Sequence, residues 1–365
     1  MRVLHCIPTF LGGGAERQLA YLCEGLSARG VSVHVVLLTD GPHGARARAA
    51  GATLHALGHR GTYDPSILWE LCGLIRTVDP QVVQTWLPRM DLWGGLAARA
   101  MKRPWVYSER SSARLPLTWQ ESVRRRVIAH ASAVVANSET GAQPWRQRLG
   151  GRVPVQVIPN ALPMDEVRHA PALDRARLDL PPDAEVVLYV GRFTPEKNIP
   201  MLSEVLLRTL EIRPRAVALC CGEGPQLDRF RAQVAARGMA QRCRTLGYRR
   251  DVWSIMKLSD VFLSTSEIEG RPNAVVEAMG SGCQLVLSDI PQHREVVTAE
   301  AGLFFPRNDA NRAVERLCEA LDATGEARGA RAAAAGRAVE QFSVARMAEA
   351  YEALYQSLAQ DGGPA

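Results

Sequence analysis

Short segments rich in Val and Leu alternate with helical segments through residues 2–159, and this alternation restricts the possible folds more than any other feature. The expected strands are 2–8, 32–39, 53–57, 81–86, 105–108, 133–137 and 155–159. The expected helices between them include 15–29, 66–78, 91–101 and 117–130. Strands of this kind, separated by helices, form a parallel sheet that is covered on both faces.

Residues 160–184 interrupt the alternation, because they are rich in Pro, Asp and Arg and weakly patterned. This stretch is expected to connect two domains. The alternation then restarts, with expected strands at 185–190, 216–221, 243–246, 260–264, 284–288 and 303–305. The expected helices are 201–212, 226–237, 252–258, 273–279 and 312–323. The pattern predicts two doubly wound α/β domains in tandem, which bind ligand where the carboxyl ends of their strands face a cleft.

The expected division is a first domain at residues 1–165 and a second at 166–342. The segment 343–365 is expected to begin with an amphipathic helix at 343–360 and to end in a disordered tail. The Ala/Arg-rich segment 327–338 is expected to be a solvated helix face.

Composition is that of an ordinary globular protein, with 47% hydrophobic and 22% charged residues. A chain of 365 residues is long for one core, which favours two domains. No apolar run approaches the length of a transmembrane helix, and the start is too short and polar for a signal peptide. The eight cysteines lack Cys-x-x-Cys spacing, which favours reduced thiols in a cytoplasmic protein without structural zinc. The net charge of +6 is compatible with nucleic acid, anionic lipid or a phosphorylated substrate.

The stretch from Leu263 to Gly280 carries the strongest functional signal. An apolar strand runs into an acidic loop that contains Glu269, and Pro272 then opens a helix in which Glu277 lies one turn inside. Two carboxylates beside a helix N-terminus suit a ligand with hydroxyls at both ends and anionic phosphate in the middle, such as a nucleotide sugar. The alternative is a capped surface helix with two solvated glutamates.

Two cations follow the first strand of the second domain. Arg192 lies at the strand end, and Lys197 lies in the Pro-led turn that comes next. Together they predict a clamp for a diphosphate, which would stabilise charge on a leaving phosphate without a metal ion. No isolated Asp-x-Asp of the kind that binds divalent cations is present. The alternative is a pair of exposed cations with Glu196 as partner.

Three consecutive glycines at 12–14 follow the first strand and open the first helix. Backbone N–H groups at a helix N-terminus suit phosphate, so Gly13 and Gly14 are candidate ligands. The pattern matches neither the dinucleotide fingerprint nor the P-loop, and a tight strand-to-helix turn is the alternative. Weaker candidates end two other strands: Gly222 in a turn of close backbone approach, and Tyr248, which could stack on a base.

The order and spacing of these motifs resemble those of one protein family. Residues 2–358 are similar to the bacterial retaining glycosyltransferases of the GT-B fold in the nucleotide-sugar-dependent family 4, also called glycosyltransferases group 1. The resemblance is carried by the loop at 12–16, Gly-Arg-x-x-Pro-Glu-Lys-Asn at 191–198, Gly-Glu-Gly-Pro at 222–225 and Glu-Gly-x-Pro-Asn-x-x-x-Glu-Ala-Met at 269–279. It implies two Rossmann-like doubly wound parallel-sheet domains facing a cleft, the first binding the acceptor and the second the nucleotide sugar. The final helix should cross back onto the first domain.

The resemblance also implies roles for individual residues. Arg192 and Lys197 would hold the donor diphosphate, while Glu277 would hold the ribose hydroxyls. Glu269 would touch the transferred sugar, so Glu269, Arg192 and Lys197 are the expected catalytic residues. The expected donor-binding residues are Gly13, Gly14, Gly191, Arg192, Lys197, Gly222, Tyr248, Glu269, Gly270, Arg271, Asn273 and Glu277. No cofactor and no metal site is implied.

One departure from the family concerns the reacting centre. Many members carry a His shortly after the fifth strand of the first domain, whereas this chain has Glu109 and Arg110 there. Relatives that use lipid-linked sugars are similar in this respect, and whether Glu109 replaces the His stays open. The family is associated with front-face displacement, in which the leaving phosphate accepts the proton of the acceptor and no protein base is needed.

The acceptor is expected on the first domain, and its candidate residues are Glu109, Arg110, Arg124 and Arg125. Three arginines at 124–126 share one expected helix with Trp119. Basic residues with Trp and Leu suit an anionic membrane surface or the phosphate of a polyprenyl-diphosphate-linked sugar. The expected location is therefore cytoplasmic, at the inner face of the plasma membrane. The alternative is a solvated basic helix face.

These features predict a metal-independent retaining hexosyltransferase. It would move a hexosyl or N-acetylhexosaminyl unit from a UDP sugar to a glycan or lipid-linked acceptor, in cell-surface polysaccharide or glycolipid synthesis. A nucleotide-sugar epimerase or hydrolase of the same fold is the second hypothesis, although no convincing base and acidic pair is found in the first domain. A nucleic-acid-binding module is a third, and without any RNA or DNA fold signature no nucleic-acid partner is expected. Ile268 and Arg271 encode no particular hexose, so the sugar and the acceptor stay open.

Overall fold

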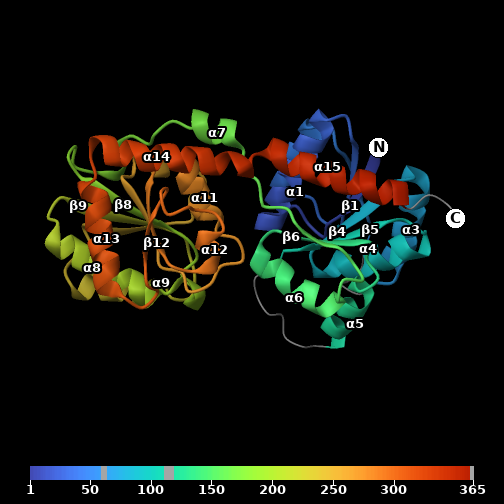
Figure 1. Cartoon of the computed structure of the whole chain (residues 1–365), viewed down its shortest axis with the longest axis horizontal. Helices are drawn as coiled ribbons and strands as arrows, with labels where there is room; N and C mark the ends of the chain where they lie inside the picture. Colours follow the sequence, from blue (N-terminus) through green and yellow to red (C-terminus); the bar gives the residue numbers. More distant parts are fainter. Residues whose placement is uncertain (59–63, 111–118, 362–365) are drawn as a thin grey trace. The chain divides into compact units, whose positions relative to one another are not determined.

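The computed structural model of the chain, drawn in Figure 1, describes residues 1–58, 64–110 and 119–361. The tail expected to be disordered falls at 362–365, outside the described residues. The chain folds into two compact units. Unit 1 comprises Met1–Ala161 and the segment that begins at Phe342, and unit 2 comprises Leu162–Gln341. The chain therefore leaves unit 1 once and returns to it at the end.

Within the described residues, unit 1 is built on a seven-stranded parallel sheet in the order β3-β2-β1-β4-β5-β6-β7. Its strands are β1 Arg2–Cys6, β2 Ser32–Leu37, β3 Thr53–Ala56, β4 Val82–Trp86, β5 Trp105–Glu109, β6 Ala133–Ala136 and β7 Val155–Val157. The strand order reverses between β1 and β4, as in doubly wound folds.

Helices cover both faces of this sheet, and Figure 1 shows α1 and α15 on one side and α4, α5 and α6 on the other. The helices are α1 Gly14–Ala28, α2 Pro42–Ala49, α3 Ser66–Val78, α4 Pro88–Ala100, α5 Trp119–Ile128, α6 Glu139–Leu149 and α15 Val344–Asp361. Leu19, Leu22 and Leu26 of α1 are buried in one core of the unit. Their spacing places them on one face of the helix, and this apolar face is the one that packs against the core.

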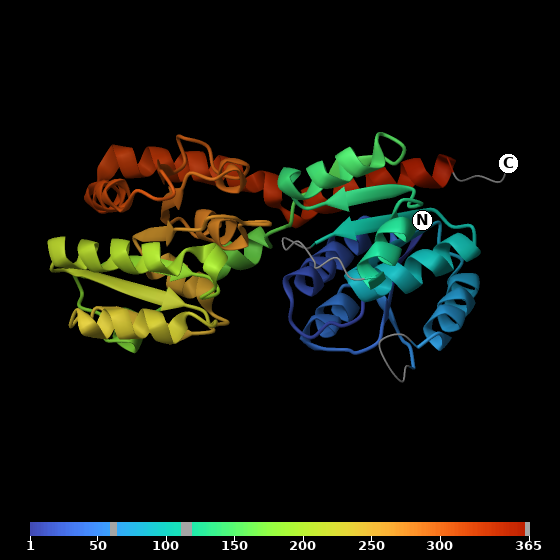
Figure 2. The same cartoon turned by 90° about the horizontal axis from the view of Figure 1, so that it is seen from below.

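The C-terminal helix α15 packs along α1 and lies against the rest of unit 1 in both views (Figures 1 and 2). The two helices approach so closely that a Cβ added at Gly25 would lie 2.7 Å from the Cβ of Ala348. Tyr351 and Tyr355 of α15 are fully buried, and the Tyr355 hydroxyl donates to the side-chain carbonyl of Gln84 in β4. The last helix is therefore part of the core of unit 1.

In the described part of unit 2 the sheet has six parallel strands in the order β10-β9-β8-β11-β12-β13. They are β8 Glu185–Val190, β9 Ala216–Cys221, β10 Cys243–Gly247, β11 Val261–Ser264, β12 Gln284–Ser288 and β13 Leu303–Phe305. The order reverses between β8 and β11. In open α/β sheets, ligands bind beside the carboxyl ends of the strands at such a switch point.

Figure 1 shows α14 and α11 on one side of this sheet and α8 and α9 on the other. The helices of unit 2 are α7 Met164–His169, α8 Ile199–Ile212, α9 Leu227–Ala236, α10 Val252–Leu258, α11 Asn273–Gly280, α12 Pro291–Arg294, α13 Ala310–Asp322 and α14 Gly325–Val339. Three 3₁₀ turns within the described residues are η1 Arg175–Leu178, η2 Pro195–Lys197 and η3 Glu340–Phe342. The sheet is thus covered on both faces, as the alternation predicts.

The chain passes from unit 1 to unit 2 between Ala161 and Leu162, slightly before the expected division at 165. The side-chain amide of Gln18 bonds both backbone groups of Ala161, at 2.9 Å to its oxygen and 2.7 Å to its nitrogen. These bonds hold Ala161 on unit 1. Leu162 packs in unit 2, where its Cδ2 lies 2.8 Å from the position of a Cβ added at Gly280.

The expected strands are all present and end within two residues of their expected limits. The helices α2, α6, α7 and α12 were not expected. The interior Pro144 removes a backbone donor from α6, which disfavours a helix in the sequence. Burial of Trp145 and Leu149 and the capping bond from the Gly141 N–H to the Ser138 hydroxyl stabilise that helix in the folded chain.

Candidate functional site

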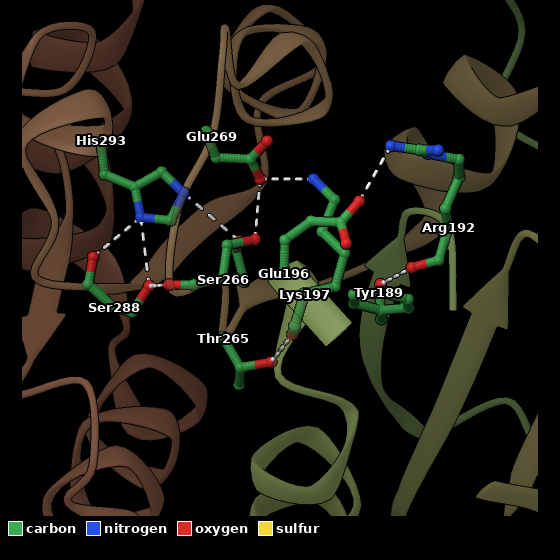
Figure 3. Close-up of polar contacts among 10 residues, drawn as sticks. Tyr189, Arg192, Glu196, Lys197, Thr265, Ser266, Glu269, Ser288 and His293 are labelled. Carbon is green, nitrogen blue, oxygen red and sulfur yellow. Dashed lines mark hydrogen bonds and ion pairs between the residues drawn. The ribbon is translucent and has the colours of Figure 1, made fainter. Parts of the chain in front are cut away.

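Two loops meet where the strand order of unit 2 reverses (Figure 3). The loop after β8 carries Arg192 and ends its 3₁₀ turn at Lys197, and the loop after β11 carries Glu269. The Nζ of Lys197 lies 2.5 Å from the Oε1 of Glu269, although the two residues are 72 positions apart. Their side chains are only 17% and 10% exposed. The structure therefore brings together a cation and a carboxylate that the sequence singled out separately.

Backbone contacts fix the two loops to each other. The N–H of Glu267 donates to the carbonyl of Glu196 at 2.9 Å, and the Thr265 hydroxyl donates to the carbonyl of Lys197 at 3.0 Å. Asn198 follows with a left-handed backbone (φ 50°), and its side chain caps the N-terminus of α8. Lys197 is thus held on a short turn between a fixed loop and a capped helix.

Small polar side chains surround the carboxylate of Glu269. The Ser266 hydroxyl donates to its Oε1 at 2.7 Å, and the Ser264 Oγ lies 3.2 Å from the Ser266 Oγ. Beyond them lies His293 of α12, whose Nε2 is 3.4 Å from the Ser264 Oγ and whose Nδ1 is 2.8 Å from the carbonyl oxygen of Ser288 (Figure 3). Burial lowers the pKa of His293, so the ring is neutral near pH 7.

Sequence analysis missed His293. The available signal was the small-polar run 264–266, since hydroxyls that follow a buried strand need hydrogen-bond partners. Nothing in the linear pattern showed that a partner would come from the helix after the next strand, β12.

Arg192 is the solvent-exposed residue of the predicted diphosphate clamp. Its side chain is 74% exposed and pairs with Glu196 at 2.9 Å, the partner named in the alternative interpretation. The Tyr189 hydroxyl donates to the backbone carbonyl of Arg192 at 2.9 Å and thereby holds the strand end. The guanidinium itself is accessible to an anion from solvent.

The loops after β8, β9 and β10 pack backbone against backbone. A Cβ added at Gly222, whose φ is +135°, would lie 2.0 Å from the carbonyl oxygen of Gly191. The Gly222 N–H donates to the Gly247 carbonyl at 2.7 Å, and the Gly191 N–H donates to the Cys221 carbonyl at 3.0 Å. Only glycine fits at 222. The close backbone approach predicted there is confirmed, while the role of Gly191 and Gly222 in donor binding stays a prediction.

The remaining donor candidates of unit 2 follow β10 and β11. Asn273 begins α11 directly after the loop that contains Gly270 and Arg271. Glu277 lies in the second turn of α11 and is 6% exposed. Arg271 is half-buried, and burial lowers the pKa of its guanidinium to about 10. Tyr248 is 72% exposed, so its ring is accessible to a base that would stack on it.

The glycine loop belongs to unit 1 and ends at α1. Gly13 is the N-cap and Gly14 the first helical residue. The side chain of Glu16 folds back over this helix end: its Oε2 lies only 2.1 Å from the position that a Cβ added at Gly13 would take. Glu16 is buried and accepts a bond from the Thr9 hydroxyl at 3.1 Å. A carboxylate at this third position is a common partner of a helix N-terminus, so this helix end already faces an anionic group of the chain.

Glu109 is the last residue of β5 and is buried. Its Oε2 accepts bonds from the Tyr107 hydroxyl at 2.9 Å and from the Trp145 Nε1 at 2.7 Å. These two donors hold the carboxylate in one orientation, at the position where the resemblance predicts a His in many family members.

Arg110 follows Glu109 and is tied to unit 1 on three sides. Its guanidinium carbon lies 4.3 Å from the centroid of the Trp86 ring. It donates to the Asn160 side chain at 2.7 Å and to the Tyr351 hydroxyl of α15 at 2.5 Å. Arg110 therefore also anchors the C-terminal helix.

Arg124 is buried, and the expectation that it faces an anionic surface is wrong. It donates to both carboxylate oxygens of Glu121, at 2.8 and 2.9 Å, and to Asp91 at 3.0 Å. Burial raises the pKa of Asp91, and Arg124 opposes that shift. Arg125 is half-buried and pairs with Glu121 at 2.6 Å. A buried charge needs partners of this kind, and the partner Asp91 lies on α4, which the charge pattern of α5 could not reveal.

The rest of the expected basic and aromatic segment is only partly described. Residues 114–118 lie outside the described residues, as does the side chain of Trp119 at the start of α5. Arg126 is exposed on this helix.

Within the described ranges, no group of three or more His, Cys, Asp or Glu side chains is arranged to hold a metal ion. The cysteines are free thiols, six of them buried. None of the helices in the described part of the chain has both the length and the apolar character needed to cross a bilayer.

The fold and the site define a class of protein. Each unit is a Rossmann-like domain, and unit 2 carries a cation and a carboxylate at its switch point, the place where open α/β sheets bind ligands. This arrangement is that of a GT-B glycosyltransferase.

Sequence models of two families match the chain. The model described as Glycosyltransferase Family 4 matches residues 12–166, and the model described as Glycosyl transferases group 1 matches residues 172–338. Together they account for most of the chain. The chain belongs to the glycosyltransferases that combine these two domains, and the resemblance to glycosyltransferases family 4 and group 1 predicted from the sequence is confirmed.

Bacterial glycosyltransferases are similar along most of the chain. The lipopolysaccharide core biosynthesis glycosyltransferase LpsE of Rhizobium meliloti is 27% identical over 312 residues, covering 84% of this chain and 85% of LpsE. The UDP-Gal:α-D-GlcNAc-diphosphoundecaprenol α-1,3-galactosyltransferase of Escherichia coli is 24% identical over 278 residues, covering 71% of each chain.

Solved structures share the fold. HepE of Anabaena in complex with UDP is similar with a TM-score of 0.82 at 20% identity, covering 98% of this chain and 100% of HepE. The same protein has also been solved with UDP-glucose. The predicted GT-B architecture is confirmed by this likeness.

Proposed function

We propose that the protein is a retaining glycosyltransferase that moves a hexosyl or N-acetylhexosaminyl unit from a UDP sugar to a glycan or lipid-linked sugar acceptor, in cell-surface polysaccharide or glycolipid synthesis. The observation that carries the proposal is the pair Lys197–Glu269 at the carboxyl ends of β8 and β11. A cation and a carboxylate 2.5 Å apart can contact the diphosphate and the sugar of one donor molecule.

The relatives support the choice of donor and acceptor. The name of the Escherichia coli relative contains UDP-Gal and a diphosphoundecaprenol-linked acceptor, and HepE was solved with UDP and with UDP-glucose. Because these relatives are glycosyltransferases, the epimerase or hydrolase alternative is not favoured.

Four side chains are proposed to bind different parts of the donor. Lys197 and the exposed Arg192 bind the diphosphate. Glu277 on α11 binds the ribose hydroxyls, and Glu269 binds the sugar. Lys197 must then exchange its carboxylate partner for a phosphate oxygen, which leaves Glu269 free to accept bonds from sugar hydroxyls.

The proposed reaction retains the anomeric configuration and needs no metal ion. The bond between the anomeric carbon and the β-phosphate oxygen breaks, while the acceptor hydroxyl attacks from the same face and forms the new C–O bond. The leaving phosphate takes the proton of that hydroxyl. Lys197 and Arg192 stabilise the negative charge that develops on the diphosphate.

The acceptor is proposed to bind unit 1, near Glu109 and Arg110, with Arg125 as a further contact.

The same unit is proposed to bind an anionic membrane surface at the cytoplasmic side. Because Arg124 is buried, the basic contribution of α5 reduces to Arg125 and Arg126. Replacing both by Gln should lower co-sedimentation with anionic liposomes at low salt, with neutral liposomes as the control. Unchanged co-sedimentation would contradict a membrane role for this helix.

The donor class is tested with a panel of nucleotide sugars in EDTA, scored by thermal shift and by donor hydrolysis. Active donors are then offered polyprenyl-diphosphate-linked sugars, and the anomeric configuration of the product is read by NMR. At least one UDP sugar should stabilise the protein and be turned over in EDTA, and the product should keep the configuration of the donor. Failure of every UDP sugar to bind would refute the proposed donor. An inverted product or a strict need for manganese or magnesium would refute the mechanism alone.

A further inference from the structure

His293 is a fully buried histidine whose ring lies beside the loop that carries Glu269 (Figure 3). It comes from the four-residue helix α12, directly after β12. A buried neutral imidazole needs hydrogen-bond partners for both ring nitrogens. Each nitrogen of His293 faces one, as the distances to Ser288 and Ser264 show.

The partners fix the position of the ring proton. Nδ1 lies 2.8 Å from the carbonyl oxygen of Ser288, which can only accept, so Nδ1 carries the proton and donates it. Since burial keeps the ring neutral, Nε2 is an acceptor, and it faces the Ser264 hydroxyl at 3.4 Å. His293 therefore bonds the ends of β11 and β12 to each other.

The same ring supports the segment that holds Glu269. Ser266 donates to the Glu269 carboxylate at 2.7 Å, and the Ser264 Oγ lies 3.2 Å from the Ser266 Oγ. From the other side, the Ser288 hydroxyl donates to the backbone carbonyl of Ser266 at 2.6 Å. Displacing His293 would release Ser264 and the Ser288 carbonyl together, and Ser266 would lose its support.

This support becomes important when the donor binds. Lys197 and Ser266 bond the same oxygen of Glu269. If Lys197 turns to the diphosphate, Ser266 remains to hold that oxygen. The orientation of Glu269 toward the sugar would then depend on the hydroxyls behind it and on His293.

We infer that His293 is a positioning residue for glycosyl transfer: by bonding the ends of β11 and β12 it fixes Ser266, whose hydroxyl orients the carboxylate of Glu269 toward the donor sugar. The inference rests on the proposed function, because it assumes that Glu269 binds the sugar. His293 makes no contact with the reacting atoms in this account and neither gives nor takes a proton in the reaction.

Two substitutions separate its two bonds. His293→Asn keeps an amide donor near the position of Nδ1 but is too short to reach Ser264, whereas the longer Gln in His293→Gln can place its carbonyl near the position of Nε2. His293→Asn should lower kcat with a UDP sugar about 10-fold or more and change the Kd for UDP less than about 2-fold, as expected when orientation is lost and nucleotide binding is kept. His293→Gln should recover part of the lost kcat.

Ser266→Ala tests the route by which His293 acts. If both residues act through the same carboxylate, the double variant should be little slower than the slower single variant, whereas independent effects would multiply. Should His293→Asn fail to fold, Ser264→Ala probes the same link without removing a buried ring.

The possible failures can be told apart. A parent enzyme that binds no UDP and turns over no UDP sugar would refute the proposed function. An active parent with an unchanged kcat in His293→Asn would refute only the positioning role. Equal losses of kcat and UDP affinity, or losses that multiply with those of Ser266→Ala, would assign His293 a general structural role and overturn the inference.

Discussion

Replacing Glu269 by Gln should tighten UDP binding and at the same time slow glycosyl transfer. The substitution keeps the size of the side chain and removes the charge that holds Lys197 at 2.5 Å. Lys197 then has no carboxylate partner to leave when a diphosphate arrives. The transferred sugar, however, loses the acceptor that a carboxylate provides, so the two measurements should move in opposite directions.

The size of the first effect follows from the burial of the pair. Fully exposed ion pairs contribute about 0–1 kcal/mol, and removing one partner of a fully buried pair costs about 3–5 kcal/mol. With side chains 17% and 10% exposed, the Lys197–Glu269 pair lies between these limits but retains solvent screening. A competing interaction of about 1 kcal/mol corresponds to roughly fivefold tighter UDP binding in Glu269→Gln. Loss of an interaction that stabilises the transition state should lower kcat by about 10²-fold.

Calorimetric titration with UDP in EDTA measures the first effect, and turnover of an active UDP sugar measures the second. Glu196→Gln is a matched control, because it removes the same charge from the partner of the exposed Arg192 and should change UDP affinity less than about 2-fold. Lys197→Ala should weaken UDP binding and lower turnover about 10²-fold. A loss of UDP affinity in Glu269→Gln as large as that in Lys197→Ala would refute the reasoning, since Glu269 would then act in nucleotide binding.

Four further substitutions test other residues. Arg192→Ala should lower turnover about 10²-fold without lowering the melting temperature, because the side chain is largely exposed; near-parental turnover would remove its diphosphate role. Glu277→Gln should weaken UDP binding more than it lowers kcat at saturating donor, and unchanged UDP affinity would exclude the ribose contact. Gly25→Ala should destabilise unit 1 by about 1–3 kcal/mol in chemical denaturation, because the added Cβ would lie 2.7 Å from the Cβ of Ala348. Gly336→Ala on α14, with nothing within 4 Å, should instead stabilise by about 0.5–1 kcal/mol, and equal effects at both sites would contradict the packing argument.

Local pattern was sufficient for most of the fold. The helix expected at 66–78 has those limits in the structure, and the strands expected at 185–190 and 216–221 do too. The helix has apolar residues at helical spacing, whereas the two strands are short continuous apolar runs. Gly, Pro or charged residues flank all three segments, and these signals are local. The pattern failed at α6, where Pro144 disfavours the helix locally and burial of Trp145 outweighs that effect.

The candidate site was predictable only residue by residue. Lys197 and Glu269 could be selected because charged residues that follow the carboxyl ends of buried parallel strands are exposed to ligand. Their pairing could not be predicted, because it depends on β8 and β11 being neighbours in the sheet despite the two strands that separate them in the sequence. Arg124 is the opposite case. It was also predicted to be exposed to a ligand because of its charge, but it is buried, because Asp91 and Glu121 lie beside it.

The sequence by itself determined two doubly wound domains, the strands that build their sheets, and the cations and carboxylates that follow those strands. Strand and helix periodicity, turn residues and charge at strand ends are local properties, so they can be read without knowing which segments become neighbours. Only the tertiary structure decided that Lys197 contacts Glu269 and that His293 lies against Ser264, at the start of the loop that carries Glu269. These contacts depend on the order of strands in the sheet, and that order arises when distant segments bury their apolar faces against one another.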